Sequence, residues 1–306
     1  MLSALAAVDR ADQKGLSLRD SRFSYHIHKD EQIHPSNRTV GRVGLHDAVL
    51  HSSNAYFIHL VNDLDLYGRL AYIYGHAGIS TGSSGMPYRL MYRTPQESWL
   101  DRVTAMASGA TKRYRDYIDK RMQGGFRKLN DWHISHPAWQ WAWGQGLDAT
   151  PLAVARMTAA VTDGRMPVTR FRMDVRPESV HVADNGRNLS YLRQAMRDEA
   201  LKLGSRTRLA KAGVMGKSGT AERVYQGSLY KEGTVQTKVN DAWYTCIVPD
   251  CRLTKVVNGQ QVVTEGPVAV TVRIERTSAM SGVAKLLTEE VVMPVLAELG
   301  YIPAWQ

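Results

Sequence analysis

The sequence predicts an α+β fold, or a layered α/β/α arrangement, in which a mostly helical region precedes a sheet enclosed by helices. Helical periodicity dominates the first half of the 306 residues, strand-like segments are confined to the last third, and an amphipathic helix closes the chain. Because helices and strands are segregated, the pattern differs from the regular βαβ winding of a parallel sheet. We expect one domain over residues 1–306, with a mostly helical lobe at 1–165 and a sheet-containing part at 166–306.

The expected helices follow from apolar residues spaced three and four apart. Residues 1–10 read as the last turns of a helix, and further helices are expected at 44–50, from 54 onward, at 96–122 and at 191–203. Pro151 stands at the favoured first position of another helix, which Gly164 ends. Polar and turn-rich stretches at 15–40 and 75–92 predict loops.

Three strands are expected at 214–224, 241–249 and 267–276. The third alternates strictly, with Val268, Val270, Val272 and Ile274 on one face. An Asn-Gly pair at 258 and 259 separates two β-rich runs and predicts a hairpin with a type I′ turn. Residues 280–299 predict a final amphipathic helix that tolerates Pro294.

The composition is that of an ordinary globular protein, with 43% apolar and 22% charged residues. No run of apolar residues is long enough to span a membrane, and the first residues lack the basic start of a signal peptide. Half of the net charge of +10 lies at residues 93–128, which fits either a solvated helical face or an anionic partner. No nucleic-acid-binding motif accompanies this charge, so we expect no nucleic-acid partner.

Metal chemistry finds little support in the sequence. Cys246 and Cys251 form no Cys-x-x-Cys pair, and His26, His28 and His34 are loosely spaced, so we expect no metal site. The two cysteines could close a tight disulfide in an oxidising compartment or stay reduced, and we favour the reduced state.

Three short motifs follow one another along the chain. They are Ser52-Ser53-Asn54 at the start of a helix, Trp143-Gly144-Gln145-Gly146 followed by Thr150-Pro151-Leu152, and Lys217-Ser218-Gly219-Thr220-Ala221 on a strand. Each motif alone is weak, because Ser and Asn also cap helices and a glycine in a strand also marks a bulge. The order and spacing of the set carry more information than its members.

In this order, the motifs resemble those of the transpeptidase domain of penicillin-binding proteins, most closely the monofunctional cell-wall enzymes. The resemblance implies a DD-peptidase/β-lactamase-like fold, in which an antiparallel sheet is flanked by helices. The family has five strands, of which two precede the nucleophile helix, so we expect an incomplete sheet of three here. The segment at 143–152 and the chain length argue against a β-lactamase.

The resemblance also implies roles for the motif residues. Ser52 would relay a proton, Asn54 would bind the substrate amide, and Lys217 would place a cation beside the cleft. Ser218 and Thr220, two apart on a strand, would hold a substrate carboxylate, and the Thr220 N–H would serve the oxyanion hole. Gly219 would let the substrate backbone approach the strand, and Ala221 is a further candidate for substrate binding. The family usually has Thr where this chain has Ser218, and the hydroxyl is retained.

The family's Ser-x-x-Lys nucleophile motif has no counterpart in the expected place. The one match, Ser-Leu-Tyr-Lys at 228–231, follows Lys217 and lies between two strands, so we attribute it to chance. Residues 1–9 are similar to the segment that continues the nucleophile helix. We therefore expect the catalytic lysine immediately before Met1, the serine three residues further back, and this chain to be an inactive fragment.

The resemblance implies a serine D,D-transpeptidase of peptidoglycan synthesis and cell division that needs no cofactor and is a target of β-lactams. Its partners would be peptidoglycan stem peptides and other cell-wall synthesis proteins. It would act on the periplasmic or outer face of the inner membrane, with any anchor in the missing N-terminal part. The alternative is a non-catalytic scaffold or sensor domain of the same fold, which the missing nucleophile favours.

Overall fold

The computed structural model describes residues 2–28, 40–79, 149–170, 175–202, 208–224, 238–257, 259–277 and 282–305, and also Ala142, Gly144 and Leu147. Its helices are α1 (Leu2–Gln13), α2 (Leu45–His51), α3 (Asn54–Asp63), α4 (Tyr67–Ala77), α8 (Pro151–Ala159), α9 (Arg187–Leu201), α10 (Arg208–Lys211), α11 (Gly282–Leu287) and α12 (Met293–Glu298). A 3-10 turn, η1 (Ser21–Phe23), follows α1, and a π-helical turn, η4 (Thr288–Val292), joins α11 to α12.

The strands form three antiparallel sheets. Two are short pairs, β1 (Tyr25–Ile27) with β2 (Gly41–Val43) and β3 (Arg165–Pro167) with β4 (Ser179–His181). The third has the order β5 (Met215–Val224), β6 (Lys238–Val257) and β7 (Gln260–Thr277), which confirms the predicted antiparallel ladder. Among the strands described, none pairs with the outer edge of β7.

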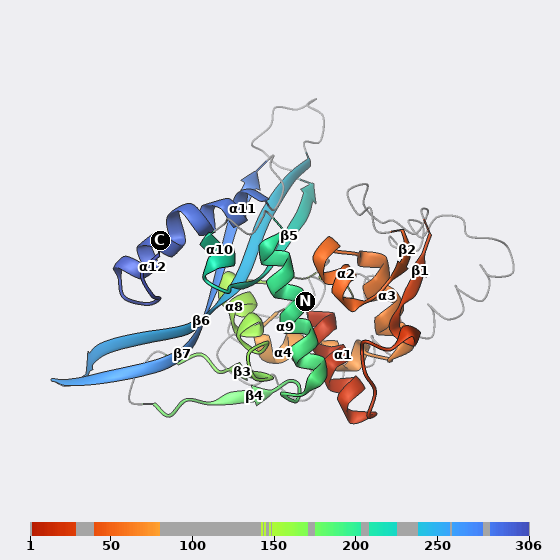
Figure 1. Ribbon diagram of the computed structural model, residues 1–306, viewed down its shortest axis with the longest axis horizontal. Helices are drawn as coiled ribbons and strands as arrows, with labels where there is room; N and C mark the ends of the chain where they lie inside the picture. Colours follow the sequence, from red (N-terminus) through yellow and green to blue (C-terminus); the bar gives the residue numbers. More distant parts are fainter. Residues whose placement is uncertain are drawn as a thin grey trace, which may run out of the picture.

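The hairpin of β6 and β7 is longer than expected. Val257 pairs with Gln260, and Gly259, directly before Gln260, has a φ of 78°. The pairing shifts between Val248 and Cys251, and beyond this bulge the two strands continue as an arm that projects from the body (Figure 1). The hairpin predicted from the Asn-Gly pair is therefore confirmed, although position 258 lies outside the described residues.

Helices cover both faces of the main sheet because its side chains alternate. Ile247 of β6 belongs to the larger apolar cluster, which includes Met157 of α8 and the N-terminal helices. Tyr244 and Cys246 belong to a second cluster with Met293 of α12. Helix α9 runs along β5, between the sheet and the N-terminal helices (Figure 1).

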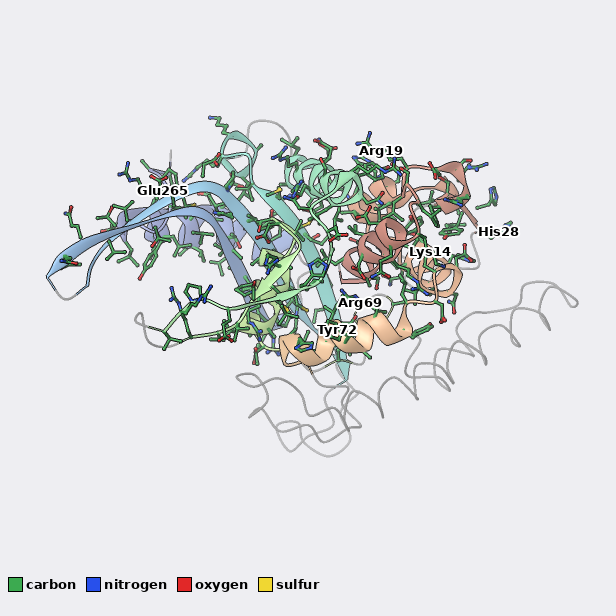
Figure 2. All side chains as sticks on the ribbon, turned by 90° about the horizontal axis from the view of Figure 1, so that it is seen from below. Lys14, Arg19, His28, Arg69, Tyr72 and Glu265 are labelled. Carbon is green, nitrogen blue, oxygen red and sulfur yellow. The ribbon has the colours of Figure 1, made fainter. Side chains whose placement is uncertain are left out.

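Helix α1 lies within the larger cluster, and residues 4–8 have no exposed surface. A helix that is apolar on all sides is stable only when it is enclosed in this way. The carboxylate of Asp9, which is 3% exposed, lies 2.9 Å from Nε of Arg69 on α4. The Arg69 guanidinium also lies over the ring of Tyr72, one turn further along α4 (Figure 2). This ion pair therefore fixes α1 to α4.

Several expectations were incomplete. Helix α4 and the two short strand pairs were not predicted, and β1 lies in a stretch that we expected to be a loop. The final helix is present but is interrupted by the π-helical turn η4. The helix expected at 96–122 and the basic stretch at 93–128 lie outside the described residues. Cys246 and Cys251 are both free and buried, as favoured from the sequence.

Candidate active site

Ser52 lies at the tight junction between α2 and α3. Its φ of 55° and ψ of 47° are left-handed. The N–H groups of Ser52 and Ser53 both donate to the Ala48 carbonyl, a helix ending that usually requires glycine. Ser53 then caps α3, with its Oγ accepting from the Tyr56 N–H at 3.4 Å. Two helix ends meeting within two residues leave the partly exposed Ser52 side chain at the corner between them.

Lys217 of β5 contacts Ser52. Its Nζ donates to Ser52 Oγ at 2.5 Å and to the carbonyl oxygen of Ser218 at 2.9 Å, although Ser52 and Lys217 are 165 residues apart in sequence. An ammonium group can only donate, so Ser52 Oγ is the acceptor and its own proton is available to a further partner. This geometry suits a hydroxyl that passes a proton between a lysine and a third group.

Ser218 points to the opposite face of the sheet. Lys217 pairs with Thr245 of β6, whereas Ser218 pairs with Tyr244, and consecutive strand residues face opposite sides. The N–H and the hydroxyl of Ser218 both donate to Oε1 of Glu199 on α9, at 3.2 and 2.6 Å. The hydroxyl that we expected to hold a substrate carboxylate is thus engaged by a carboxylate of the chain itself.

Glu199 is buried together with a second lysine. Glu199 is 3% exposed and Lys285 of α11 is 4% exposed. Lys285 Nζ donates to the backbone carbonyl of Glu199 at 2.8 Å and lies 3.7 Å from Oε2 of its carboxylate. The same Nζ lies over the ring of Tyr244, 5.6 Å from its centroid. The Glu199 carboxylate is therefore close to Lys285 and hydrogen-bonded to Ser218, the neighbour of Lys217 in β5.

The charges of this cluster influence one another. Burial lowers the pKa of Lys217, and Lys202 and Lys285 act in the same direction, whereas the Glu199 carboxylate raises it. Burial opposes ionisation of Glu199, but Lys217, Lys285 and the hydrogen bonds from Ser218 outweigh it and lower the pKa of this carboxyl. Burial also lowers the pKa of Lys285, against the opposing effect of Glu199 and Glu289. Glu199 is therefore an anion at neutral pH, beside lysines that lose protons more easily than usual.

Two glycines of β5 differ in their need for space. A Cβ atom on Gly216 would lie 2.0 Å from the Tyr244 hydroxyl oxygen and 2.6 Å from the adjoining ring carbon. A Cβ atom on Gly219 would meet only the Cβ of Trp243, at 3.7 Å. Packing thus requires glycine at 216 and not at 219, and the substrate approach expected at Gly219 stays a prediction.

The remaining motif residues make fewer contacts. Asn54 is the first residue of α3 and is partly exposed, and no hydrogen bond joins its side chain to Ser52 or Lys217 in the part of the chain described. Thr220 is exposed on β5 opposite Ala242, and Ala221 pairs with Asp241. Their roles toward a substrate stay predictions.

The second motif is only partly visible. Thr150 caps α8, since its Oγ1 accepts from the Ala153 N–H at 3.1 Å, and Pro151 is the first helical residue as expected. Of the four residues Trp-Gly-Gln-Gly at 143–146, only Gly144 is among the described residues, with a φ of 88°. The Ser-Leu-Tyr-Lys sequence at 228–231 also lies outside them.

The sequence interpretation missed Glu199 and Lys285. Both occupy positions in amphipathic helices where a charged residue ordinarily faces water. The spacing of Glu199 from its apolar neighbours Ala195, Met196 and Ala200, all of them buried, was the available signal that it faces inward.

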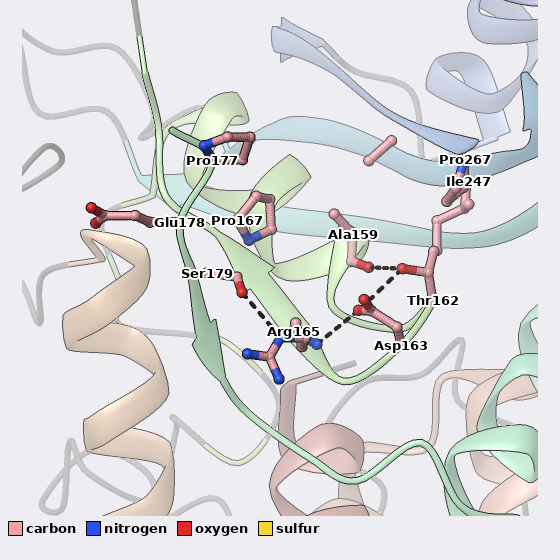
Figure 3. Close-up of a pocket in the computed structure, with 11 residues that line it drawn as sticks. Ala159, Thr162, Asp163, Arg165, Pro167, Pro177, Glu178, Ser179, Ile247 and Pro267 are labelled. Atoms are coloured by element: carbon pink, nitrogen blue, oxygen red, sulfur yellow. Dashed lines mark hydrogen bonds between the residues drawn. The ribbon is translucent and has the colours of Figure 1, made fainter. Parts of the chain in front are cut away.

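A pocket of about 290 Å³ lies elsewhere, between α8, the β3–β4 pair and the middle of β7 (Figure 3). Arg165 and Ser179 form its polar wall, joined by a hydrogen bond of 3.1 Å from Nε to Oγ. None of the motif residues lines it. The described part of the chain contains no group of three or more acidic, His or Cys side chains suited to a metal, and no helix there has the length and apolar character to cross a bilayer.

Comparison with known proteins identifies a family. The model of the "penicillin binding protein transpeptidase domain" matches residues 11–267. A peptidoglycan synthetase from Bifidobacterium adolescentis has 14% identity and a TM-score of 0.52, covering 97% of this chain and 48% of its own. Penicillin-binding protein PBP2 from Helicobacter pylori has 17% identity and a TM-score of 0.51, covering 98% and 49%. The chain thus spans about half the length of these two proteins, and their likeness shows the fold. A search of curated proteins gave no match.

Proposed function

Because the chain belongs to the penicillin-binding protein transpeptidase domain family, we propose that it provides the Ser52–Lys217 side of a serine D,D-transpeptidase site acting on peptidoglycan stem peptides. The observation that carries the proposal is the hydrogen bond of 2.5 Å between Lys217 Nζ and Ser52 Oγ. It joins two of the family's motifs across the boundary between helices and sheet.

In the proposed reaction, a serine from a Ser-x-x-Lys segment attacks the carbonyl carbon between two terminal D-alanines and gives its hydroxyl proton to the lysine of that segment. This proton later replaces the one that Ser52 gives to the leaving amine. The tetrahedral intermediate collapses, the C–N bond breaks, and the leaving amine of D-alanine takes up a proton. An amine of a neighbouring stem peptide then attacks the acyl-enzyme ester. The acyl group forms an amide bond with this amine, and the serine hydroxyl is released. β-Lactams would acylate the same serine.

Ser52 and Lys217 are suited to protonating the leaving amine in this reaction. Since Lys217 donates to Ser52 Oγ, the Ser52 hydroxyl proton can be given to the leaving amine, while the nearby ammonium stabilises the oxygen that gives it up. The partly exposed cation also attracts the terminal carboxylate of a stem peptide. Ser52 and Lys217 thus position the stem peptide and protonate its leaving amine. The covalent step needs the serine of the Ser-x-x-Lys segment.

We further propose that the 306-residue chain alone forms no acyl-enzyme. Its one Ser-x-x-Lys sequence, at 228–231, comes after Lys217 in the chain, whereas the family's motif precedes the Ser-x-Asn motif. In keeping with the family, we place the activity on the periplasmic or outer face of the bacterial inner membrane, in cell-wall synthesis and cell division.

The test is acylation by a fluorescent penicillin, read on a denaturing gel. We expect no covalent band from the 306-residue chain, and a band from the chain extended by the in-frame codons upstream of Met1. Lys217→Ala and Ser52→Ala in the extended chain should each weaken that band. A band from the 306-residue chain would refute the assignment of the nucleophile.

The alternative function is a non-catalytic scaffold or sensor domain of the same fold. The observation in its favour is the absence of a Ser-x-x-Lys motif on any described helix. A stop codon directly upstream, or upstream codons without the motif, would support this alternative over the enzyme.

A further inference from the structure

The last turns of α9 hold both sides of the candidate site. Asp198 accepts a hydrogen bond from His46 of α2, with 2.7 Å between Oδ2 and Nε2. Lys202 Nζ donates to the Leu50 carbonyl at 3.0 Å, two residues before Ser52. Glu199, between them, accepts two hydrogen bonds from Ser218 of β5. Residues 198–202 therefore form hydrogen bonds both to α2, which ends just before Ser52, and to the strand that carries Lys217.

Hydrogen bonds continue from Glu199 to the site. Its Oε1 fixes the N–H and the hydroxyl of Ser218, so the Ser218 peptide is held against α9. The carbonyl of Ser218 accepts from Lys217 Nζ at 2.9 Å, and that Nζ donates onward to Ser52 Oγ. Movement of the Glu199 carboxylate would therefore move one of the two acceptors that orient the Lys217 ammonium.

The burial of Glu199 is difficult to explain by stability alone. Removing a carboxylate from water costs several kcal/mol, and an ion pair recovers this only when all of its hydrogen bonds are satisfied. Oε2 of Glu199 has no hydrogen-bond partner among the described residues, and Lys285 Nζ is 3.7 Å away. Apolar side chains in place of both Glu199 and Lys285 would avoid this cost, so the retained charges point to an effect on their neighbours.

We infer that Glu199 is a positioning residue of the transpeptidase site, which orients Lys217 through Ser218 and supplies a buried counter-charge to the Lys217 ammonium. The inference rests on the proposed function and assigns to the site a residue outside the three motifs. The positive charge of Lys285 lies close to the Glu199 carboxylate. The same charge also repels the Lys217 ammonium. The C-terminal helix α11 thereby influences a site that it does not line.

This arrangement predicts opposite effects of the two partners on Lys217. The charged groups around it are Glu199 of α9, Lys202 directly after α9, and Lys285 of α11. In Glu199→Gln the amide oxygen can still accept from Ser218, but the charge is lost, so the pKa of Lys217 should fall. In Lys285→Met a neighbouring positive charge is lost, so the pKa of Lys217 should rise.

The experiment measures the titration of Lys217 by NMR in the 306-residue chain carrying lysine labelled with carbon-13 at Cε, with Lys217→Arg identifying the signal. Asp198→Asn is the matched control, because Asp198 adjoins Glu199 in sequence but bonds to His46. We expect a lower midpoint in Glu199→Gln, a higher one in Lys285→Met and little change in the control. Unchanged midpoints in both variants, or shifts of the same sign, would overturn the inference. If Glu199→Gln does not fold, the Lys285→Met measurement still decides, since an unchanged or lower midpoint there refutes it.

The titration needs no nucleophile, so it is independent of the acylation test. If the midpoints shift as expected and the extended chain is not acylated, the positioning role of Glu199 stands and the proposed enzyme fails. If the extended chain is acylated and the midpoints do not move, the enzyme stands and the role of Glu199 fails.

Discussion

The left-handed backbone at Ser52 should make glycine there more stabilising than alanine. Both Ser52→Gly and Ser52→Ala remove the Oγ that accepts from Lys217, so this loss cancels in their comparison. With a φ of 55°, a Cβ-bearing residue in this region costs about 1–2 kcal/mol. Glycine's greater freedom in the unfolded chain returns about 0.4–1 kcal/mol of that difference. We therefore expect Ser52→Gly to exceed Ser52→Ala in unfolding free energy by about 1 kcal/mol.

Urea unfolding followed by circular dichroism measures this difference. The matched control is Ser190, an exposed residue inside α9, where the order should reverse because alanine is favoured over glycine in a helix by about 1 kcal/mol. Equal stabilities of the two Ser52 variants, or a more stable alanine variant, would show that the junction is not strained. The predicted order also separates stability from function, since the more stable glycine variant lacks the relay hydroxyl.

Three further predictions follow from burial and charge. Gly216→Ala should lower the unfolding free energy by about 2 kcal/mol, because its Cβ would overlap Tyr244, while Gly219→Ala should change it little in the same urea assay. Burial raises the pKa of Cys246 and of Cys251, so a thiol reagent should react with them only on unfolding, and rapid reaction of the native protein would contradict this. Because folding lowers the pKa of Glu199, its stabilising contribution is present above 4.5 and is lost as the pH falls through the lowered value. The stability gap between the parent chain and Glu199→Gln should thus narrow in acid, and a constant gap would refute the charge assignment.

The strands of the sheet were readable from the sequence because their signals are local. The alternation of Val268, Val270 and Val272 identifies a strand with one buried face, and an Asn-Gly pair identifies the turn before it. The antiparallel order of the three strands came from the family resemblance, because 13 residues separate the end of β5 from the start of β6. The contact of Ser52 with Lys217 likewise came from the resemblance of the motifs, since no periodic pattern relates residues so distant in sequence.

Some elements were missed, although Tyr67, Leu70, Ala71 and Tyr74 of α4 have helical spacing. Helix α4 starts after Leu66, which offers no side-chain cap, and the strands β1 to β4 have three residues each, too few to establish a period of two. The inward position of Glu199 depends on Ser218 and Lys285, which reach it from other elements. The periodicity of α9 places Glu199 on the buried face, but the groups that it contacts there cannot be read from a local pattern.

The arm of β6 and β7 gives the sheet a place to begin folding. Its turn closes only two residues between Val257 and Gln260, so the first pairs form with a small loss of chain entropy, on the microsecond scale of isolated hairpins. Further residue pairs of β6 and β7 can then form one after another from the tip toward the body. This pairing determines which face of the sheet each β6 side chain occupies before β5 pairs with β6. The tip of the arm, which is distant from Lys217 in the folded protein, would in this way set the register of β6, the strand with which β5 and its Lys217 pair.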